Sequence, residues 1–146
     1  MLDSRSSSSW SDAELLWRLL YTKPHAEVWA EANLRKQGFV VLLPRVATSS
    51  GFGPLFPRYV FAGLRTEQPS GTIRSTYGVQ YMVHCGDKPA RVPLEVVSEI
   101  RTRMDAYGVV RLDTVATPDA LFTKRERERV RALVKLAQAG FRVRSA

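Results

Sequence analysis

The sequence predicts an α+β fold in which a four-stranded, mostly antiparallel sheet is flanked by helices. Four apolar runs have the length of strands, and other segments carry apolar residues at helical spacing. The elements follow one another as strand, helix, strand, strand, a segment with room for a short helix, strand and helix. This order favours helices packed against an antiparallel sheet. The length of 146 residues allows one domain with extensions.

Residues 1–13 are polar and rich in serine, so they are predicted to form a flexible arm. The domain itself is expected to occupy residues 14–110. Its first strand is predicted from Leu15 to Tyr21, a run about as long as a strand that is buried on both faces. The polar and proline-containing residues 22–24 end this strand.

The first helix is predicted to begin at Pro24, which suits the first helical position, and to end at Gly38, which can cap a helix. The apolar residues that recur between them at helical spacing are Ala26, Trp29, Ala30 and Leu34. A second strand is predicted over residues 39–43. Residues 47–54 contain Gly, Ser and Thr and are predicted to form a loop.

The third strand is predicted over residues 55–64, and both of its faces are apolar. Alternation places Tyr59 and Phe61 on one face and Phe56, Val60 and Leu64 on the other. Each face must therefore be covered. If helices cover one face, a partner protein could cover the other.

Residues 67–78 are polar and turn-rich, and the fourth strand is predicted over residues 79–85. Pro93 is predicted to begin the last helix of the domain, with Gly108 as its cap. The residues expected on its apolar stripe are Val96, Val97, Ile100, Met104 and Tyr107.

Residues 111–122 are predicted to be a linker, and residues 123–146 a separate basic segment. This segment holds eight Lys or Arg against two Glu, whereas residues 1–122 hold fourteen basic and twelve acidic side chains. Apolar residues at 130, 133, 134 and 137 after a capping-box sequence predict a helix. Alternation at 130, 132, 134 and 136 also permits a β-hairpin, but Leu133 on its polar side counts against that interpretation.

Several motifs, in the right order, resemble the N-terminal domain of NusG-type transcription factors, particularly the RfaH-like antitermination branch. They are residues 20–27 (LYTKPHAE), 33–39 (NLRKQGF), 43–44 (LP), 55–61 (LFPRYVF), 73–76 (IRST), 78–79 (GV) and 86–93 (GDKPARVP). The resemblance implies a factor that docks on the coiled-coil clamp helices of the largest RNA polymerase subunit and suppresses pausing or termination.

The resemblance also implies two sets of binding residues. The polymerase-binding set matches Tyr21, Tyr59 and Phe61, with Phe56 and Met82 as weaker members. The second set would contact the non-template DNA strand of the transcription bubble and matches Lys23, Asn33, Thr72 and Arg74. Large aromatics with a polar tip are favoured anchors for a partner surface.

Three departures from the family pattern qualify these expectations. Tyr77 stands where the family commonly has Arg, and residues 69–71 (PSG) replace a His-Thr-Thr stretch. Both departures weaken the expectation of gate-loop contact and base-specific DNA reading. About thirty residues follow Asp113, too few for the C-terminal KOW barrel of about fifty residues in relatives. The segment from Thr123 to Ala139 is hypothesised to pack as a helix over Tyr59 and Phe61.

The sequence gives little support for an enzyme. His84 and Cys85 are neighbours that would point to opposite faces of a strand, and Cys85 is expected to be a buried, inert thiol. No metal, cofactor, small-molecule substrate or membrane contact is expected, and a cytoplasmic monomer is predicted. The alternative function is a sequence-tolerant module that binds single-stranded nucleic acid.

Overall fold

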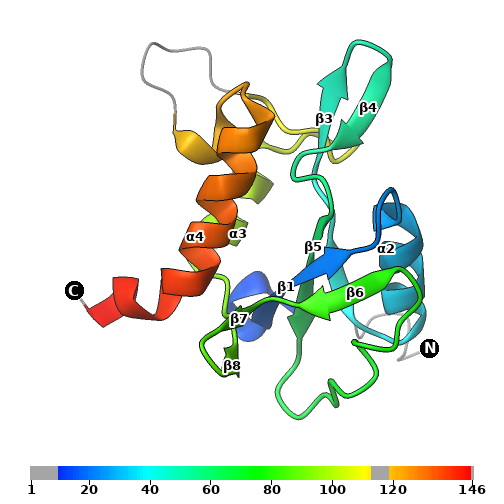
Figure 1. Ribbon diagram of the computed structural model, residues 1–146, viewed down its shortest axis with the longest axis vertical. Coiled ribbons are helices and arrows are strands. Elements are labelled where there is room, and N and C mark those ends of the chain that lie inside the picture. The colour runs from blue at the N-terminus through cyan, green and yellow to red at the C-terminus, as the bar shows by residue number, and fades with distance from the viewer. Residues whose placement is uncertain (1–9, 113–118, 146) are drawn as a thin grey trace.

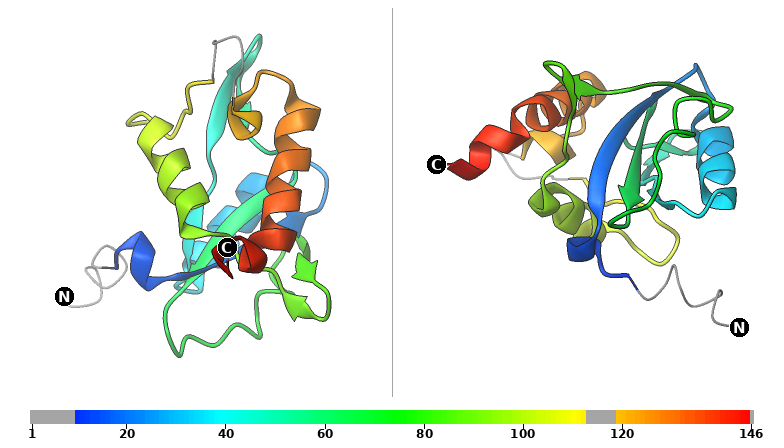
Figure 2. Two further views of the ribbon diagram at one scale, coloured as in Figure 1. Left: turned by 90° about the vertical axis from the view of Figure 1, so that its left-hand side faces the viewer. Right: turned by 90° about the horizontal axis from the view of Figure 1, so that it is seen from below.

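The fold has three layers, with a central sheet between one helix on one face and two helices on the other (Figures 1 and 2). The computed structural model of the chain describes residues 10–112 and 119–145. The four-stranded sheet has the order β2-β5-β1-β6, and all of its neighbouring strands are antiparallel. The predicted α+β fold with a four-stranded antiparallel sheet is thus confirmed.

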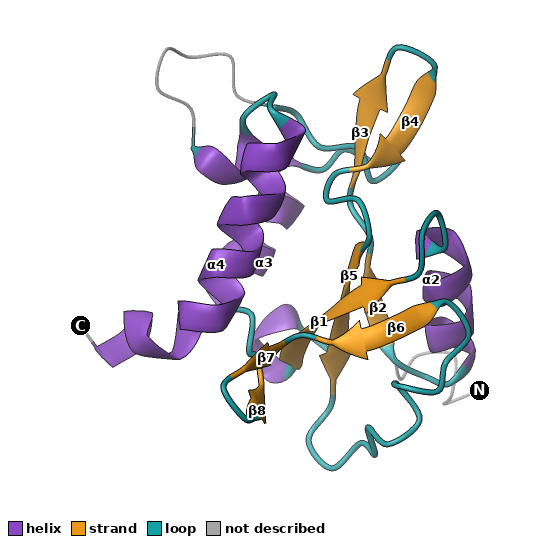
Figure 3. Ribbon diagram, in the orientation of Figure 1, coloured by secondary structure: helices purple, strands orange, loops and turns teal. Residues whose placement is uncertain are grey.

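The elements of the main layers are three α-helices and four strands (Figure 3). The strands are β1 (Leu16–Thr22), β2 (Val40–Leu42), β5 (Tyr59–Leu64) and β6 (Val79–Met82). The α-helices are α2 (Glu27–Lys36), α3 (Leu94–Arg103) and α4 (Glu126–Ser145). Two short 3₁₀ turns are η1 (Asp12–Glu14) and η2 (Ala120–Phe122). Strands β3 (Arg45–Thr48) and β4 (Gly51–Pro54) form one hairpin, and strands β7 (His84–Cys85) and β8 (Lys88–Pro89) form another.

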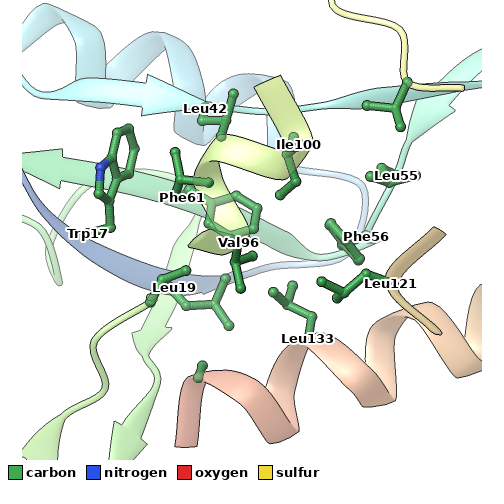
Figure 4. Packing of buried hydrophobic residues seen from close by; sticks show 14 of the residues in the cluster. Trp17, Leu19, Leu42, Leu55, Phe56, Phe61, Val96, Ile100, Leu121 and Leu133 are labelled. Atoms are coloured by element: carbon green, nitrogen blue, oxygen red, sulfur yellow. The ribbon is translucent and has the colours of Figure 1, made fainter. Parts of the chain in front are cut away.

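Each face of the sheet has its own apolar core because both faces of β1 and β5 carry large apolar side chains. On one face, Leu20 and Val60 pack with Leu34 of α2. On the other face, Leu19 and Phe61 belong to a larger cluster that α3 and α4 complete (Figure 4). Helices on both sides of the sheet therefore explain why both faces of the third strand are apolar.

Helix α2 begins later than predicted and ends as predicted. His25 adopts a left-handed backbone conformation (φ 58°) that is incompatible with a right-handed helix. The helix therefore begins at Glu27 and not at Pro24. At the other end Gly38 has φ 93°, and its N–H bonds to the carbonyl of Arg35 at 2.9 Å. The N–H of Phe39 reaches the carbonyl of Leu34, which completes a Schellman cap.

The basic C-terminal segment forms a helix, as the capping and periodicity signals favoured, and not a hairpin. Helix α4 extends from Glu126 to Ser145 and continues through Gly140. Leu133 and Ala137 are buried in the same cluster as Phe61, while Val130 and Leu136 pack against it from partly exposed positions. Full burial of one leucine side chain contributes roughly 1.5–3 kcal/mol.

The third strand is shorter than predicted, and this changes the position of Phe56. Strand β5 begins at Tyr59, because Arg58 has φ 74° and the N–H of Tyr59 bonds to the carbonyl of Phe56 in a turn. Phe56 therefore does not lie on the Val60 face. It packs on Phe61, with ring centroids 6.1 Å apart, in the core beneath α3 and α4.

The predicted loop at residues 47–54 is part of the β3–β4 hairpin, whose strands pair from Arg45 with Pro54 to Thr48 with Gly51. Residues 67–78 hold consecutive turns and no helix. In these turns the N–H groups of Ile73, Thr76 and Val79 each bond to the carbonyl three residues earlier.

Helix α3 ends at Arg103, so the predicted stripe stops short of Tyr107. The chain turns at residues 105–108, where the carboxylate of Asp105 accepts hydrogen bonds from the N–H groups of Tyr107 and Val109. Gly108, with φ 80°, belongs to this turn and is not the helix cap. As a result Tyr107 is 80% exposed.

Parts of the predicted N-terminal arm and of the predicted linker pack against the folded domain. Residues 1–9 of the predicted arm lie outside the described residues, but Trp10 packs against the core and Asp12 forms an ion pair with Arg101 at 2.8 Å. The predicted linker at 111–122 includes η2, whose Leu121 and Phe122 are buried. The guanidinium carbon of Arg103 lies 3.9 Å from the centroid of the Phe122 ring.

Gly78 seats the turn segment directly on α2, and its replacement is expected to destabilise the fold. It has φ 98°, and a Cβ atom there would lie 2.9 Å from the backbone nitrogen of Ala30. We expect Gly78→Ala to lower the free energy of unfolding by about 2 kcal/mol or more, measured by urea denaturation. Gly71→Ala is the matched control, because a Cβ atom there meets nothing within 4 Å. Equal stability of the two variants would contradict this account.

Candidate partner-binding surface

Three tyrosines from three adjacent strands form a continuous aromatic cluster on the sheet face opposite α2. Tyr21 of β1 pairs in register with Tyr59 of β5 and with Tyr81 of β6. The ring of Tyr21 lies 5.1 Å from that of Tyr59 and 4.8 Å from that of Tyr81, between ring centroids. Residues 21, 59 and 81 are called the tyrosine cluster below. Such cross-strand aromatic pairs are a common source of sheet stabilisation.

Arg58 joins the tyrosine cluster at the start of β5. Its guanidinium carbon lies 4.3 Å from the centroid of the Tyr21 ring. The side chain is held by the carbonyl of Thr22, at 3.1 Å from Nε, and by Gln80, at 3.1 Å from a terminal nitrogen. Its backbone N–H bonds to the buried carboxylate of Glu27 at 2.7 Å. The cation is therefore fixed against the aromatic rings.

The tyrosine cluster is accessible. Tyr81 is 47% exposed, and Tyr21 and Tyr59 are half-buried. Aromatic side chains that are already ordered lose little conformational freedom on binding, and their hydroxyl groups can hydrogen-bond at the edge of an interface. The cluster is thus suited to contact a protein surface. Tyr21 and Tyr59 were predicted here, whereas Tyr81 was missed.

Partial burial raises the pKa of Tyr59 above its ordinary value, with a smaller contribution from the neighbouring Tyr81 and Tyr21 phenols, and Arg58 opposes the shift. Because folding raises this pKa, the Tyr59 phenol contributes folding stability that is fully present below about pH 10, the pKa of tyrosine in the unfolded chain. This contribution is lost as the pH rises through the pKa of Tyr59 in the folded protein. We expect Tyr59→Phe to remove a component of the phenolate absorbance titration that lies above the ordinary pH range of a tyrosine. A titration unchanged by this substitution would contradict the assignment.

The inner part of the same face is closed. Phe61 and Phe56, both predicted to bind a partner, are 0% and 1% exposed. They share a cluster with Leu133 and Ala137 of α4 and with Leu121 and Phe122 of η2. Figure 4 shows Leu133 of α4 and Leu121 directed toward Phe56 and Leu19. The aromatic face therefore has an accessible part, the tyrosine cluster, and a part that α4 covers.

A buried arginine also holds α4 in place. Arg129 is only 3% exposed, and its Nε donates to the carbonyl of Leu55 at 3.1 Å. A terminal nitrogen donates to the carbonyl of Thr123 at 3.0 Å. Burial lowers the pKa of Arg129, and the nearby Glu126 partly opposes this effect. The Leu55 contact ties α4 to the chain just before Phe56.

The far part of α4 contacts the β7–β8 hairpin through polar groups. The side chain of Gln138 donates to the carbonyl of His84 at 3.2 Å, and the thiol of Cys85 donates to the carbonyl of Gln138 at 2.6 Å. Cys85 is exposed, so the prediction of a buried thiol is wrong. The reason is that its strand is a two-residue element at the edge of the domain and not part of the central sheet.

Met82 does not belong to the aromatic face. It pairs with Leu20, and both side chains are buried in the core on the α2 side of the sheet. Alternation in β6 places Tyr81 on the opposite face, and Val83 also packs in the core on that side. The same alternation could have identified Tyr81 in place of Met82.

The four predicted DNA-contacting residues lie around α2 and the turn segment packed on it. Lys23 is exposed, and its N–H bonds to the carbonyl of Gly78 at 2.9 Å. The amide of Asn33 donates to the carbonyls of Trp29 at 2.9 Å and Tyr77 at 3.5 Å. Thr72 and Arg74 are exposed on the turn segment. Contacts between α2 and residues 72–78 thus bring the two parts of the predicted set to one side of the molecule.

Two findings concern what the described part of the chain does not contain. Among residues 10–112 and 119–145, no three His, Cys, Asp or Glu side chains gather in a way that could hold a metal ion. In the same residues, no helix has both the length and the apolar character needed to cross a membrane.

Comparison with known proteins gives a family match over most of the folded region. Residues 15–101, more than half of the chain, match the protein-family model described as "NusG: Transcription termination factor nusG". A solved structure described as "Domain interaction in Thermotoga maritima NusG" aligns with a TM-score of 0.44 and 20% sequence identity. That alignment covers 56% of this chain and 52% of the other, so this chain spans about half the length of that protein.

Proposed function

This chain belongs to the NusG family of transcription factors, and on that premise we propose that it binds RNA polymerase through the tyrosine cluster of its sheet and promotes elongation. Proteins of this family interact with RNA polymerase. The observation that carries the proposal is the accessible stack of Tyr21, Tyr59 and Tyr81, with Arg58 fixed beside it. The partner surface would be the coiled-coil clamp helices of the largest polymerase subunit.

Helix α4 leaves one part of the proposed binding face accessible and covers the other part. The tyrosine cluster is accessible while α4 is in place, but Phe56 and Phe61 are not. A partner that uses the whole aromatic face must displace Leu133 and Ala137, and it must compensate for the contacts that α4 loses. Helix α4 would thus lower the affinity by favouring the covered conformation, as the RfaH-like interpretation of this chain implies.

The proposed effect on transcription requires no chemistry. A factor that binds an elongating polymerase more tightly than a paused one shifts the population toward elongation. Docking on the clamp helices, with the α2 side near the non-template strand, would hold the clamp closed in this way. Suppression of pausing or termination is then the expected outcome of binding.

A general single-stranded nucleic-acid binder is the second candidate function. The exposed pair Trp29 and Tyr77 favours it. The charge distribution counts against it as the main function, because residues 1–122 carry fourteen basic and twelve acidic side chains, a small excess for a protein that relies on phosphate contacts.

The test is a binding titration of the full-length protein against polymerase core and against the isolated clamp-helix fragment. The double variant Tyr21→Ala/Tyr81→Ala removes two accessible rings, and Tyr107→Ala removes an exposed ring elsewhere as the control. We expect the double variant to bind at least about tenfold more weakly, because aromatic anchors at interfaces contribute about 1–2 kcal/mol or more each. Circular dichroism checks that both variants keep their fold.

Unchanged affinity of the double variant, or an equal loss for Tyr107→Ala, would remove the tyrosine cluster from the proposed interface. Absence of saturable binding by the wild-type chain would count against the proposal only if Leu133→Asp, which is expected to displace α4, also failed to bind.

A further inference from the structure

A polar cavity lies at the end of the sheet where β1 begins and β5 ends (Figure 1). Its volume is about 430 Å³, which is within the usual range for a small-molecule site. The lining comes from η1, the start of β1, the end of β5 with the turn that follows it, and one residue close to β8. Three arginines take part in this lining, and they are called the arginine triad below: Arg18, Arg65 and Arg91.

Backbone carbonyls hold two members of the arginine triad in place. A terminal nitrogen of Arg18 donates to the carbonyls of Pro89 at 3.2 Å and Ala90 at 3.3 Å. A terminal nitrogen of Arg65 donates to the carbonyl of Gly38 at 3.0 Å. Both side chains are half-buried. Their guanidinium groups are therefore already oriented, so a ligand would need to order little of the chain on binding.

The positive charge of the arginine triad has no counter-ion in the part of the chain that the structure describes. None of its three members forms an ion pair there. The pKa of Arg18 is lowered, first by burial and second by the positive charge of the nearby Arg91. Two like charges in such proximity disfavour each other, and an anion bound between them would remove this repulsion.

Two glutamates also line the cavity, and they limit the kind of anion that fits. One carboxylate oxygen of Glu14 accepts a hydrogen bond from the N–H of Ser11 at 2.9 Å, and Glu67 is exposed. A long polyanion would meet these two negative charges beside the arginines. A small molecule with one phosphate group avoids this repulsion, and its hydroxyl groups could donate to the carboxylates.

We propose that the arginine triad binds a phosphate group, either free or carried by a small molecule. Arginine presents a planar fork of N–H donors that matches the oxygens of phosphate, and several guanidinium groups can share these oxygens. A carboxylate has only two oxygens and is a poorer match for three arginines. The site is separate from the proposed polymerase contact, because alternation along β1 places Arg18 on the sheet face opposite Tyr21.

The test is isothermal titration calorimetry of the full-length protein with ribose 5-phosphate at constant ionic strength. We expect saturable binding of ribose 5-phosphate and none of ribose, which lacks the phosphate. Arg18→Gln and Arg91→Gln are each expected to weaken binding about tenfold or more, because each removes charge-assisted hydrogen bonds to the phosphate. Arg74→Gln changes an exposed arginine outside the cavity and is expected to have no effect.

Two further measurements separate ligand contact from a change in the fold. Arg18→Gln also loses the bonds to the carbonyls of Pro89 and Ala90, whereas Arg91 is exposed, so Arg91→Gln is expected to keep the fold. In the wild-type chain, the Nε–H resonance of Arg18 is expected to shift in NMR spectra as ribose 5-phosphate is added. Arg18→Lys keeps the charge but not the planar fork, so it is expected to restore only part of the affinity.

A parallel titration with inorganic phosphate identifies the source of the phosphate group. Equal affinity for inorganic phosphate and ribose 5-phosphate would support the site with the free anion as its ligand, and tighter binding of ribose 5-phosphate would support a phosphorylated small molecule. No saturable binding of either probe would overturn the proposal. Equal affinities of the wild-type chain, Arg18→Gln and Arg91→Gln, or an equal loss for Arg74→Gln, would also overturn it.

The outcome is independent of the polymerase experiment. Arg91→Gln is expected to bind the clamp-helix fragment as the wild-type chain does. The double variant Tyr21→Ala/Tyr81→Ala is expected to bind ribose 5-phosphate normally. Normal clamp-helix binding by the tyrosine variant would remove the proposed polymerase surface and leave the phosphate site intact. Normal phosphate binding by Arg18→Gln and Arg91→Gln would remove the phosphate site and leave the polymerase surface intact.

Discussion

Leu133→Asp is expected to increase the affinity of the full-length chain for the clamp-helix fragment by about tenfold or more. Leu133 is completely buried in the cluster that contains Phe56 and Phe61. Burial of an aspartate there would forfeit the packing of the leucine and bury a charge, a penalty of several kcal/mol, so α4 would leave the sheet. The aromatic face would then be available without competition.

The control for this experiment is Lys135→Asp, which places an aspartate at an exposed position of the same helix. It is expected to leave both the affinity and the position of α4 unchanged. Limited trypsin digestion reports the position of α4, because cleavage after its Lys and Arg residues requires local unfolding of the helix, which is easier once the helix has left the sheet. Rapid cleavage of Leu133→Asp without any gain in affinity would contradict the role of α4 as a cover.

Arg129→Ala is expected to lower the free energy of unfolding by about 2–4 kcal/mol in urea denaturation. The substitution removes the hydrogen bonds to the carbonyls of Leu55 and Thr123 in a buried site. Each buried group that loses its partner costs about 1–3 kcal/mol, and relief of the buried charge offsets part of the sum. Arg131→Ala, at an exposed position of α4, is expected to change stability by less than about 0.5 kcal/mol.

Arg129→Lys separates the geometry of the guanidinium from its charge. The two carbonyls are reached by different nitrogens of one planar group, which a single ammonium does not reproduce. Arg129→Lys is therefore expected to recover less than half of the stability lost in Arg129→Ala. Full recovery would mean that the charge, and not the two hydrogen bonds, holds α4 at this point.

The order and type of the main elements could be predicted from the sequence because they depend on local patterns. The run that became β1, the Gly38 cap and the periodicity of residues 130–137 each involve residues close together in the chain. The register between strands is not local. Met82 entered the polymerase-binding set through the family resemblance, whereas its pairing with Leu20 places it in the core on the α2 side of the sheet.

The other corrections have local physical causes that residue type does not reveal. Arg58 and His25 adopt positive φ angles although they are not glycine, which moved the start of β5 and of α2. Phe122 lies in a three-residue 3₁₀ turn, which is too short to have a periodic pattern, yet it is fully buried. Residues 47–54 contain many turn-forming residues, which predicted a loop. Only the turn itself is irregular, because the residues on either side of it pair as the strands β3 and β4.

The candidate site was predicted in part. Tyr21 and Tyr59 lie in the accessible cluster, whereas Phe56 and Phe61 lie beneath α4. The hypothesis that the C-terminal segment packs as a helix against Tyr59 and Phe61 agrees with the observed cluster. Exposure of Trp29 and Tyr77 could not be predicted, because aromatic residues on a helix and in a turn segment are more often buried.

Photo-crosslinking from position 81 tests the central claim most directly. A photoreactive phenylalanine analogue would replace Tyr81, which lies at the exposed edge of the tyrosine cluster, and a second protein would carry it at Tyr107 as the control. In an assembled elongation complex, we expect position 81 to crosslink to the clamp helices of the largest polymerase subunit and position 107 not to do so. Crosslinks from position 107 but not from position 81, or from position 81 to another part of the polymerase, would contradict the proposed interface.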